Sequence, residues 1–113
     1  MDAITPSVEV NAAGQVAVAW YDYRNDVAGD TAATTDYWNA ISSDGGATWT
    51  EQRLTSASFD ISTAPVAPAS RGYFLGDYMG LASRGDTFAN LYIVATGDTA
   101  NRNEVVFQNV TQP

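Results

Sequence analysis

The sequence predicts an all-β fold built from two antiparallel sheets, and three observations lead to this expectation. Helical periodicity is nearly absent from the 113 residues. Short runs of β-branched and aromatic residues recur along the chain, separated by clusters of Gly, Asn, Asp and Pro. Hydrophobic residues make up 45% of the chain, which is enough for the core of one ordinary globular domain.

The first half of the chain predicts four strands. In the second of them, Val16, Val18 and Trp20 alternate with small or aromatic side chains, which suits a strand buried on both faces. A short Ala-Ala-Gly turn precedes it, so this strand and the one before it are expected to form a hairpin. The expected strands span residues 6–11, 15–23, 36–42 and 48–54.

The second half of the chain predicts three more strands. They follow a crossover over residues 56–70, where Pro65 and Pro68 stand among Ala and Ser. We therefore expect a complete four-stranded unit over residues 1–55 and a second unit over residues 71–113 that lacks its outer strand. The three expected strands span residues 73–82, 88–96 and 104–110.

The hairpin between the third and fourth strands carries the pattern S-x-D-x-G-x-T-W. Asp44 is expected to accept backbone N–H groups of its own turn, and glycine can take the positive φ that a tight hairpin needs. Trp49 is expected to bury about 200 Å² between neighbouring sheets. The residues that we expect to hold this turn are Ser42, Asp44, Gly46, Thr48 and Trp49.

Four segments together resemble the carboxyl-terminal end of bacterial sialidase-like proteins with BNR (Asp-box) repeats. They are VAWYDYRND at 18–26, SSDGGATW at 42–49, SFD at 58–60 and FLGDYMGLA at 74–82. The resemblance implies that each unit is an antiparallel β-propeller blade. The chain departs from the family at residues 91–96, where a Trp-containing strand is usual, and the upstream blades are missing.

Two blades alone would leave two apolar sheet faces and a sheet edge in water. Closed propellers contain four to eight blades, so either the chain is a piece of a longer protein or several copies close one ring. Four copies would give eight blades and two would give a strained ring of four. We favour a homotrimer, because six blades is the usual count in the family that the chain resembles.

The charge balance excludes several classes of partner. Thirteen acidic residues stand against five basic ones, with no His, and the net charge of −8 disfavours nucleic acid and anionic membranes as partners. The absence of Cys removes disulfides and thiol chemistry, and no window approaches the length of a membrane span. An acidic surface of this kind favours an extracellular or periplasmic location, although the chain carries no signal-peptide pattern.

Candidate ligand-binding residues lie at the start of the second unit. Asp77 and Tyr78 fall on the predicted strand 73–82, where a propeller faces its central channel, and Arg71 precedes them. Tyr78 could act as a nucleophile or hydrogen-bond donor, and Asp77 as an acid, a base or a cation ligand. Arg71 could bind a carboxylate or a hydroxyl-rich ligand. The alternative is that Asp77 and Tyr78 only fix their strand and that Arg71 pairs with Asp77 or Asp60.

The loop after the second strand gathers oxygen ligands that suit Ca²⁺, with Asp22, Asp26 and Asp30 as the candidates. Their spacing does not match an EF-hand loop, so we predict no resident metal or other cofactor. Arg24 is expected to pair with Asp22 or Asp26.

Two functions remain open from the sequence, beside a third possibility, that the chain is a purely structural fragment with no ligand. The first is a non-catalytic, sialidase-like propeller module that binds carbohydrate and assembles with itself. The alternative is a glycoside hydrolase of exo-sialidase type, or a fragment of one, for which the resemblance implies an arginine triad, a Tyr nucleophile and an Asp acid spread over several blades. Identical copies around an axis would repeat every channel residue, which suits binding better than a site of unlike residues.

Overall fold

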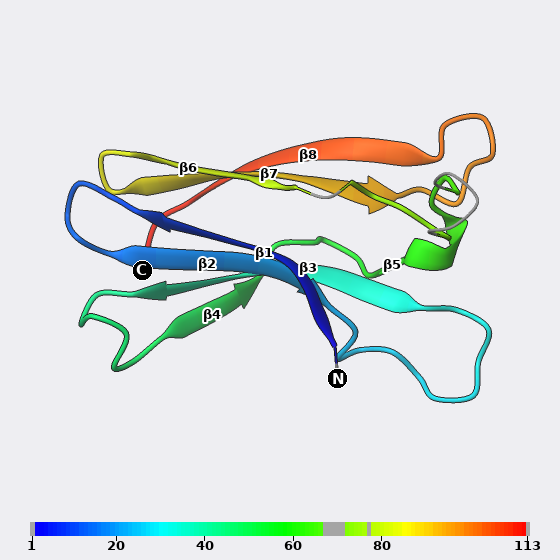
Figure 1. Cartoon of the computed structure of the whole chain (residues 1–113), viewed down its shortest axis with the longest axis horizontal. Helices are drawn as coiled ribbons and strands as arrows, with labels where there is room; N and C mark the ends of the chain where they lie inside the picture. Colours follow the sequence, from blue (N-terminus) through cyan, green and yellow to red (C-terminus); the bar gives the residue numbers. More distant parts are fainter. Residues whose placement is uncertain (1, 67–71, 77, 113) are drawn as a thin grey trace.

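The structure is a computed structural model that describes residues 2–66, 72–76 and 78–112. Two antiparallel β-sheets lie one over the other, which confirms the predicted all-β class (Figure 1). In the described part of the chain, no helix is long and apolar enough to span a membrane.

The first sheet contains the strands expected from residues 1–55, in the order β1-β2-β3-β4. A short strand β5 pairs with the beginning of β3 and leads into the 3₁₀ helix η1. The elements are β1 (Ala3–Val10), β2 (Val16–Asp22), β3 (Thr34–Ser42), β4 (Thr50–Arg53), β5 (Phe59–Asp60) and η1 (Ile61–Thr63).

The second sheet has the order β6-β7-β8, with β6 (Gly80–Arg84), β7 (Thr87–Ala95) and β8 (Asn103–Val110). The expectation of a strand over residues 73–82 was wrong in extent, because β6 begins only at Gly80. Tyr73 makes an isolated bridge with Val66. Between Tyr73 and β6, the positive φ of 121° at Gly76 interrupts the extended chain.

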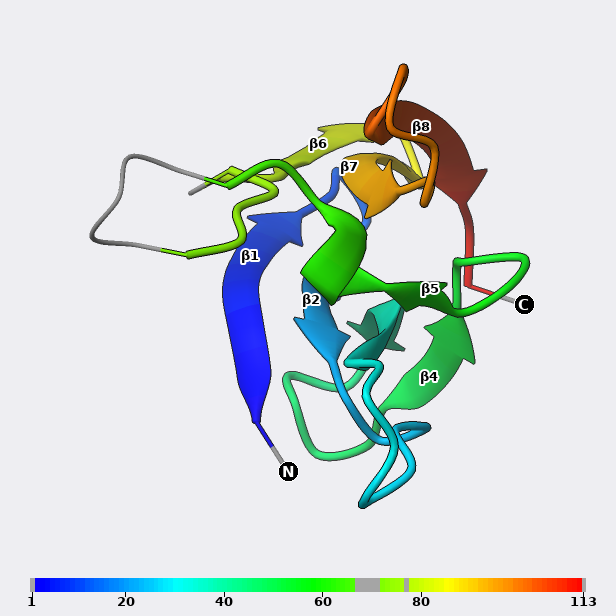
Figure 2. The ribbon, with the colours of Figure 1, turned by 90° about the vertical axis from the view of Figure 1, so that its right-hand side faces the viewer.

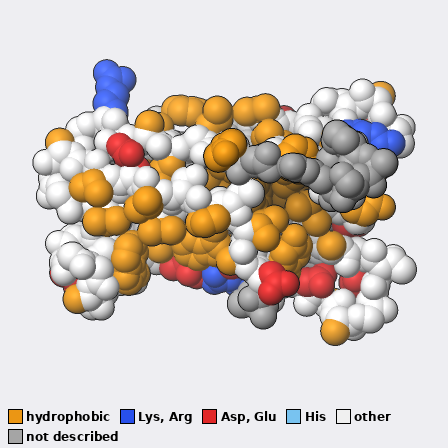
Figure 3. Space-filling view, in the orientation of Figure 1, with side chains coloured by type: hydrophobic (Ala, Val, Ile, Leu, Met, Phe, Trp, Pro, Cys, Tyr) orange, Lys and Arg blue, Asp and Glu red, His pale blue; other side chains and the backbone are white. Residues whose placement is uncertain are grey.

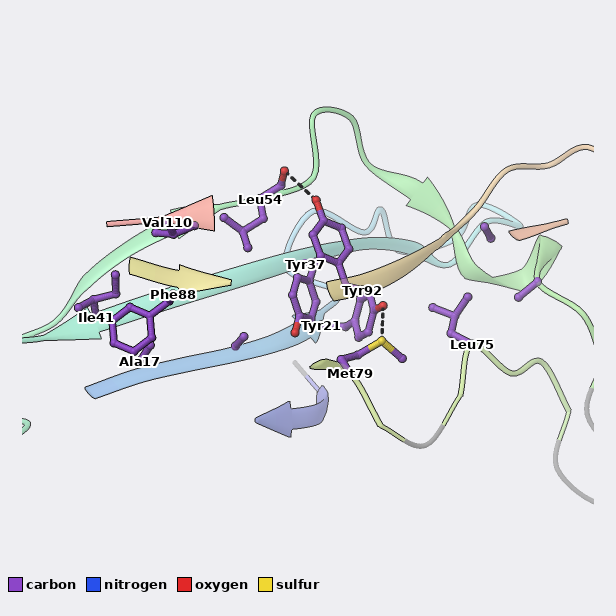
Figure 4. Packing of buried hydrophobic residues seen from close by; sticks show 13 residues of the cluster. Ala17, Tyr21, Tyr37, Ile41, Leu54, Leu75, Met79, Phe88, Tyr92 and Val110 are labelled. Atoms are coloured by element: carbon purple, nitrogen blue, oxygen red, sulfur yellow. Dashed lines mark hydrogen bonds between the residues drawn. The ribbon is translucent and has the colours of Figure 1, made fainter. Parts of the chain in front are cut away.

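The core lies between the two sheets. One face of β2 contributes Ala17, Ala19 and Tyr21, and one face of β7 contributes Phe88 and Tyr92, all fully or almost fully buried. The small side chains of β2 leave room for the rings of the other sheet, so the sheets pack closely (Figure 4).

Aromatic rings and hydroxyl groups join the two sheets across this core. The rings of Tyr37 and Tyr92 stack with their centroids 4.4 Å apart. The Tyr92 hydroxyl donates to the Leu54 carbonyl, and the Tyr21 hydroxyl donates to the Ile93 carbonyl at 2.6 Å. Burial raises the pKa of the Tyr21 hydroxyl above its ordinary value, so the hydroxyl keeps its proton and remains a donor.

The strands β1 and β6 run side by side in the same direction. Ser7 Oγ donates to the Met79 carbonyl just before β6, and the Ala12 amide donates to the Gly85 carbonyl just after it. Figure 2 shows β1 and β6 on one side of the molecule and β4 and β8 on the other. The two sheets therefore have the same strand order and the same direction, counted from β1 and β6.

Each sheet also presents an apolar face that points away from the other. On the first sheet, Val8 pairs with Val18 and Val10 pairs with Val16, so these four share the outer face. Val8 and Val10 are 66% and 54% exposed. On the second sheet, Leu91, Val105 and Phe107 occupy the outer face, and Val105 and Phe107 are each 62% exposed.

Candidate ligand-binding site

A small cavity lies between the amino-terminal half of β1 and residues 73–76. Its volume is about 160 Å³, and we call it the Thr5 cavity. On the face of the molecule that Figure 3 shows, hydrophobic side chains reach the surface across the middle. The cavity is lined by Ile4, Thr5, Tyr21, Ile61, Tyr73, Phe74, Leu75 and Gly76.

Thr5 adopts a backbone conformation that β-branched residues rarely take, with a φ of +48°. The conformation belongs to a bulge in β1: Ile4 pairs with Tyr21 and Ser7 with Ala19, so β1 holds one residue more than β2. Pro6 occupies the bulge, where its missing N–H breaks no ladder bond. Such backbone strain costs about 1–3 kcal/mol and is concentrated at functional sites.

The Thr5 hydroxyl is buried and has no hydrogen-bond partner among the described residues. Sequence reasoning missed this position, because a Thr before a proline is common in extended chains. Thr5 lies in the bulge of β1 and is one of the residues that line the cavity.

The predicted ligand-binding residues are described only in part. Arg71 and Asp77 lie outside the described residues, so their placement is left open. Tyr78 is 91% exposed. Its neighbour Met79 is buried, and its sulfur lies 3.2 Å from the Tyr21 hydroxyl oxygen. Met79 thus anchors the chain beside Tyr78 to the core.

The turn over residues 42–49 is held by its own side chains. Asp44 Oδ1 accepts the Thr48 amide at 2.9 Å, and Asp44 Oδ2 accepts the Thr48 hydroxyl. The Ser42 hydroxyl donates to Asp44 and accepts the Gly46 amide, and Gly46 has a φ of 93°. The expected burial of Trp49 was wrong, because its ring is 45% exposed and its Nε1 donates to the Gly46 carbonyl.

Acid is expected to loosen this turn. Hydrogen bonds from Thr48, followed by that from Ser42, lower the pKa of Asp44 to about 2 from an ordinary value of 3.8. Because the folded-state pKa is depressed, the stability that the Asp44 carboxylate contributes is present above pH 3.8 and is lost as the pH falls towards 2. Thermal unfolding over this range should therefore show a steeper loss of Tm in the wild type than in Asp44→Asn.

The matched control for this experiment is Asp98→Asn, which changes an exposed turn carboxylate that accepts the Ala100 amide. It should keep the wild-type slope. Equal slopes in the wild type and in Asp44→Asn would show that the turn does not depend on the carboxylate.

The carboxylates that were predicted as Ca²⁺ ligands instead bond to groups of the protein itself. Asp22 Oδ2 accepts Trp20 Nε1 and pairs with Arg24 at 2.6 Å, as expected for Arg24. Asp26 accepts the Thr34 amide, and Asp30 accepts the Ala32 amide. No group of three or more potential metal-ligating side chains occurs among the described residues.

Arg24 lies on the outer face of the first sheet, where it contacts side chains of β3 and β4. Its guanidinium lies 3.8 Å from the centroid of the Trp38 ring and also pairs with Glu51. Burial alone would raise the pKa of Asp22, but the bonds from Arg24 and Trp20 hold it below its ordinary value. The Asp22 carboxylate is therefore a partner of Arg24 within this cluster.

A second buried carboxylate, Asp36, was not singled out by the sequence. It is 1% exposed and lies opposite Asp22 across β2 and β3. Its oxygens accept Asn25 Nδ2 at 2.8 Å and the hydroxyls of Thr55 and Ser58. Asp36 thus ties the loop after β2 and the segment after β4 to β3.

A larger cleft of about 430 Å³ opens between residues 54–59 and the inner faces of β7 and β8. Tyr92, Val106 and Gln108 line its floor. It lies on the side of the molecule away from β1 and β6, where the second sheet ends at β8.

Comparison with known proteins leaves the chain without an assigned family: no family model, no curated protein and no solved structure matches it.

Proposed function

We propose that the chain is a non-catalytic, sialidase-like β-propeller module that binds carbohydrate and completes its ring by assembling with copies of itself. The observation that carries the proposal is the pair of outward apolar faces, one on each sheet. A homotrimer would bring six sheets into one ring, within the four to eight of closed propellers.

The relation between the two sheets supports this assembly. The strands β1 and β6 are adjacent and parallel, which is the arrangement that a rotation of one blade onto the next would produce in the proposed ring. The same rotation, repeated, would place a further sheet against the outer face of the second sheet. Contacts of this head-to-tail kind close into rings when the rotation divides the circle.

The outer faces are suited to such a contact. In the proposed ring, Val105 and Phe107 of one copy pack against Val8 and Val10 of the next. All four are more than half exposed in the single chain. Apolar faces of this kind on a soluble protein mark interaction surfaces.

The carbohydrate-binding part of the proposal is supported by two exposed tyrosines, of which Tyr73 lines the Thr5 cavity. Tyr73 is 56% exposed and Tyr78 is 91% exposed. Tyrosine offers a flat ring for the C–H face of a sugar and a hydroxyl for its polar edge. A ring of identical copies would present this surface several times.

Assembly is tested by Phe107→Asp. A charge on the outer face of the second sheet would have to be desolvated in the contact, so we expect the ring to dissociate into single chains. Light scattering measures the mass directly. The control is Val27→Asp, which changes a 63%-exposed valine in the loop after β2 and should keep the wild-type mass. A wild-type protein that remains monomeric at high concentration would contradict the assembly.

Catalysis is tested with a fluorogenic sialoside. The proposal expects no turnover by the wild type. Turnover that is abolished by Tyr78→Phe would establish the hydrolase alternative and remove the non-catalytic module.

A further inference from the structure

We propose that the free edge of β8, together with the cleft of about 430 Å³ beside it, binds an extended cationic peptide as an added strand. This inference goes beyond the proposed function, because it requires neither carbohydrate nor a closed ring. The ring contact uses the outer face of the second sheet, whereas the peptide uses the edge of that sheet and the cleft on its inner side.

The edge of β8 is long and regular. The strand has 8 residues and pairs with β7 without a register shift, and no other described strand pairs with it. Alternate residues of an antiparallel edge strand point their N–H and C=O groups away from the sheet, so β8 offers a row of groups for a further strand. Proline, bulges and charges usually protect such an edge, yet β8 contains no proline or bulge and Glu104 is its one charged residue.

The chain that leaves β8 does not turn back along this edge. After Val110 it crosses to the first sheet, where Gln112 Oε1 accepts hydrogen bonds from the Ser43 hydroxyl and from Gln15 Nε2, the latter at 2.8 Å. Figure 1 shows the C label beside the beginning of β2. Residues 111–112 therefore leave the edge of β8 open to a strand from another molecule.

The cleft supplies the side-chain part of the recognition. Tyr92 and Val94 of β7 and Val106 of β8 give it an apolar lining, and residues 54–59 form the opposite wall. Side chains alternate along a strand, so every second residue of an added strand would point into the cleft. Its volume lies near the lower end of the roughly 300–1,000 Å³ of ligand sites, which suits a short segment of one chain.

Glu104 determines the charge of the peptide. It lines the cleft, is exposed, and forms no ion pair with any described residue. Side chains that lie directly opposite each other on neighbouring strands interact, so a lysine opposite Glu104 would pair with it. The net charge of −8 attracts a cationic segment in addition. Strand addition at a sheet edge combines these parts, since main-chain bonds give affinity and alternate side chains give specificity.

The probe is a seven-residue peptide of sequence TVTVTKT, blocked at both ends and labelled with a fluorophore, whose anisotropy reports binding to the intact protein. Paired antiparallel with β8, its valines lie opposite Gln108 and Val106 and its lysine lies opposite Glu104. Hydrogen exchange locates the contact. We expect alternate amides of β8 to become protected when the peptide is added, because only those N–H groups point to the added strand.

Methylation of the peptide nitrogens separates strand pairing from unspecific contact. One alternate set of peptide N–H groups points to β8 and the other points away. We therefore compare two peptides, each methylated at two nitrogens of one set. One of them should bind about tenfold more weakly, because two hydrogen bonds are lost, and the other should bind like the unmodified peptide.

Variants of Glu104 test the charge. Glu104→Gln should weaken binding of TVTVTKT about threefold, as expected for an exposed ion pair, and should leave the neutral peptide TVTVTQT unaffected. Glu104→Lys should reverse the preference, so that TVTVTET binds better than TVTVTKT. Because Glu104 is exposed, these variants are expected to fold normally. The matched control is Asp98→Asn, which removes an exposed carboxylate in the turn before β8 and should keep wild-type binding.

Four results would contradict the inference. Equal affinity of the two methylated peptides would exclude pairing with β8. An unchanged preference in Glu104→Lys would exclude recognition of a cationic residue at this position. Protection of the β8 amides that rises with protein concentration, without peptide, would assign the edge to a second copy of the chain. An absence of binding by every peptide at millimolar concentration would remove the site and leave the ring and the carbohydrate binding untouched.

Discussion

Replacing Phe88 with alanine is expected to lower the free energy of unfolding by about 3–5 kcal/mol. Phe88 is fully buried and belongs to the cluster that holds Ala17 and Ile41 of the first sheet (Figure 4). Alanine would leave a void between the two sheets, because the small side chains of β2 cannot fill it. Since domains are stable by only about 5–15 kcal/mol, much of the protein's stability would be lost.

Urea unfolding followed by tyrosine and tryptophan fluorescence measures this effect as a lower midpoint at an unchanged m-value. Phe88→Leu should have a smaller effect, because it keeps most of the apolar volume. Val27→Ala, at an exposed loop position, should be close to neutral. If Phe88→Ala were as stable as Val27→Ala, the sheets could not be packed through this side chain.

The second large effect is expected at Asp36. Asp36→Ala would leave the buried Thr55 hydroxyl without its acceptor, together with the more exposed Ser58 hydroxyl and Asn25 amide, at a cost of about 3 kcal/mol. Arg53 lies 3.8 Å from the carboxylate and is partly exposed, so water can solvate its guanidinium after the change. The loop after β2 and the segment after β4 should become mobile together.

Hydrogen exchange of the amides of residues 25 and 54–58, measured alongside urea unfolding, reports both consequences of Asp36→Ala. Asp36→Asn should be intermediate, because one oxygen remains an acceptor while the new NH₂ group can only donate. Asp30→Ala, which removes an exposed carboxylate that accepts one backbone amide, serves as the control. Equal protection in Asp36→Ala and Asp30→Ala would show that the Asp36 network does not hold these segments.

Local patterns in the sequence predicted the elements whose structure depends on neighbouring residues. The hairpin of β1 and β2 and the self-bonded turn around Asp44 follow from turn residues and alternating side chains. The expected strand over residues 73–82 was too long, because β6 begins only at Gly80. The apolar residues before it lie beside β1 and β2, and the apolar pattern that suggested a strand reflects this packing. Leu75 and Met79 are buried in this way.

Trp49 shows the limit of reasoning from a motif. Its place at the start of the fourth strand suggested burial between sheets, yet its ring lies over Gly46 at the edge of one sheet and is 45% exposed. Burial of such a ring depends on a neighbouring sheet, and the motif contains no information about where that sheet lies.

The sequence alone determined the all-β class, the alternation that assigns residues to the faces of each strand, and the acidic charge that disfavours anionic partners. It could not determine which of the two faces is covered, because a period of two treats both faces alike. Only the tertiary structure decided that Ala17 and Tyr21 face the core while Val8 and Val10 face outward. Packing between sheets also decided the burial of Asp36 and the cavity at Thr5, since both are made by segments far apart in the chain.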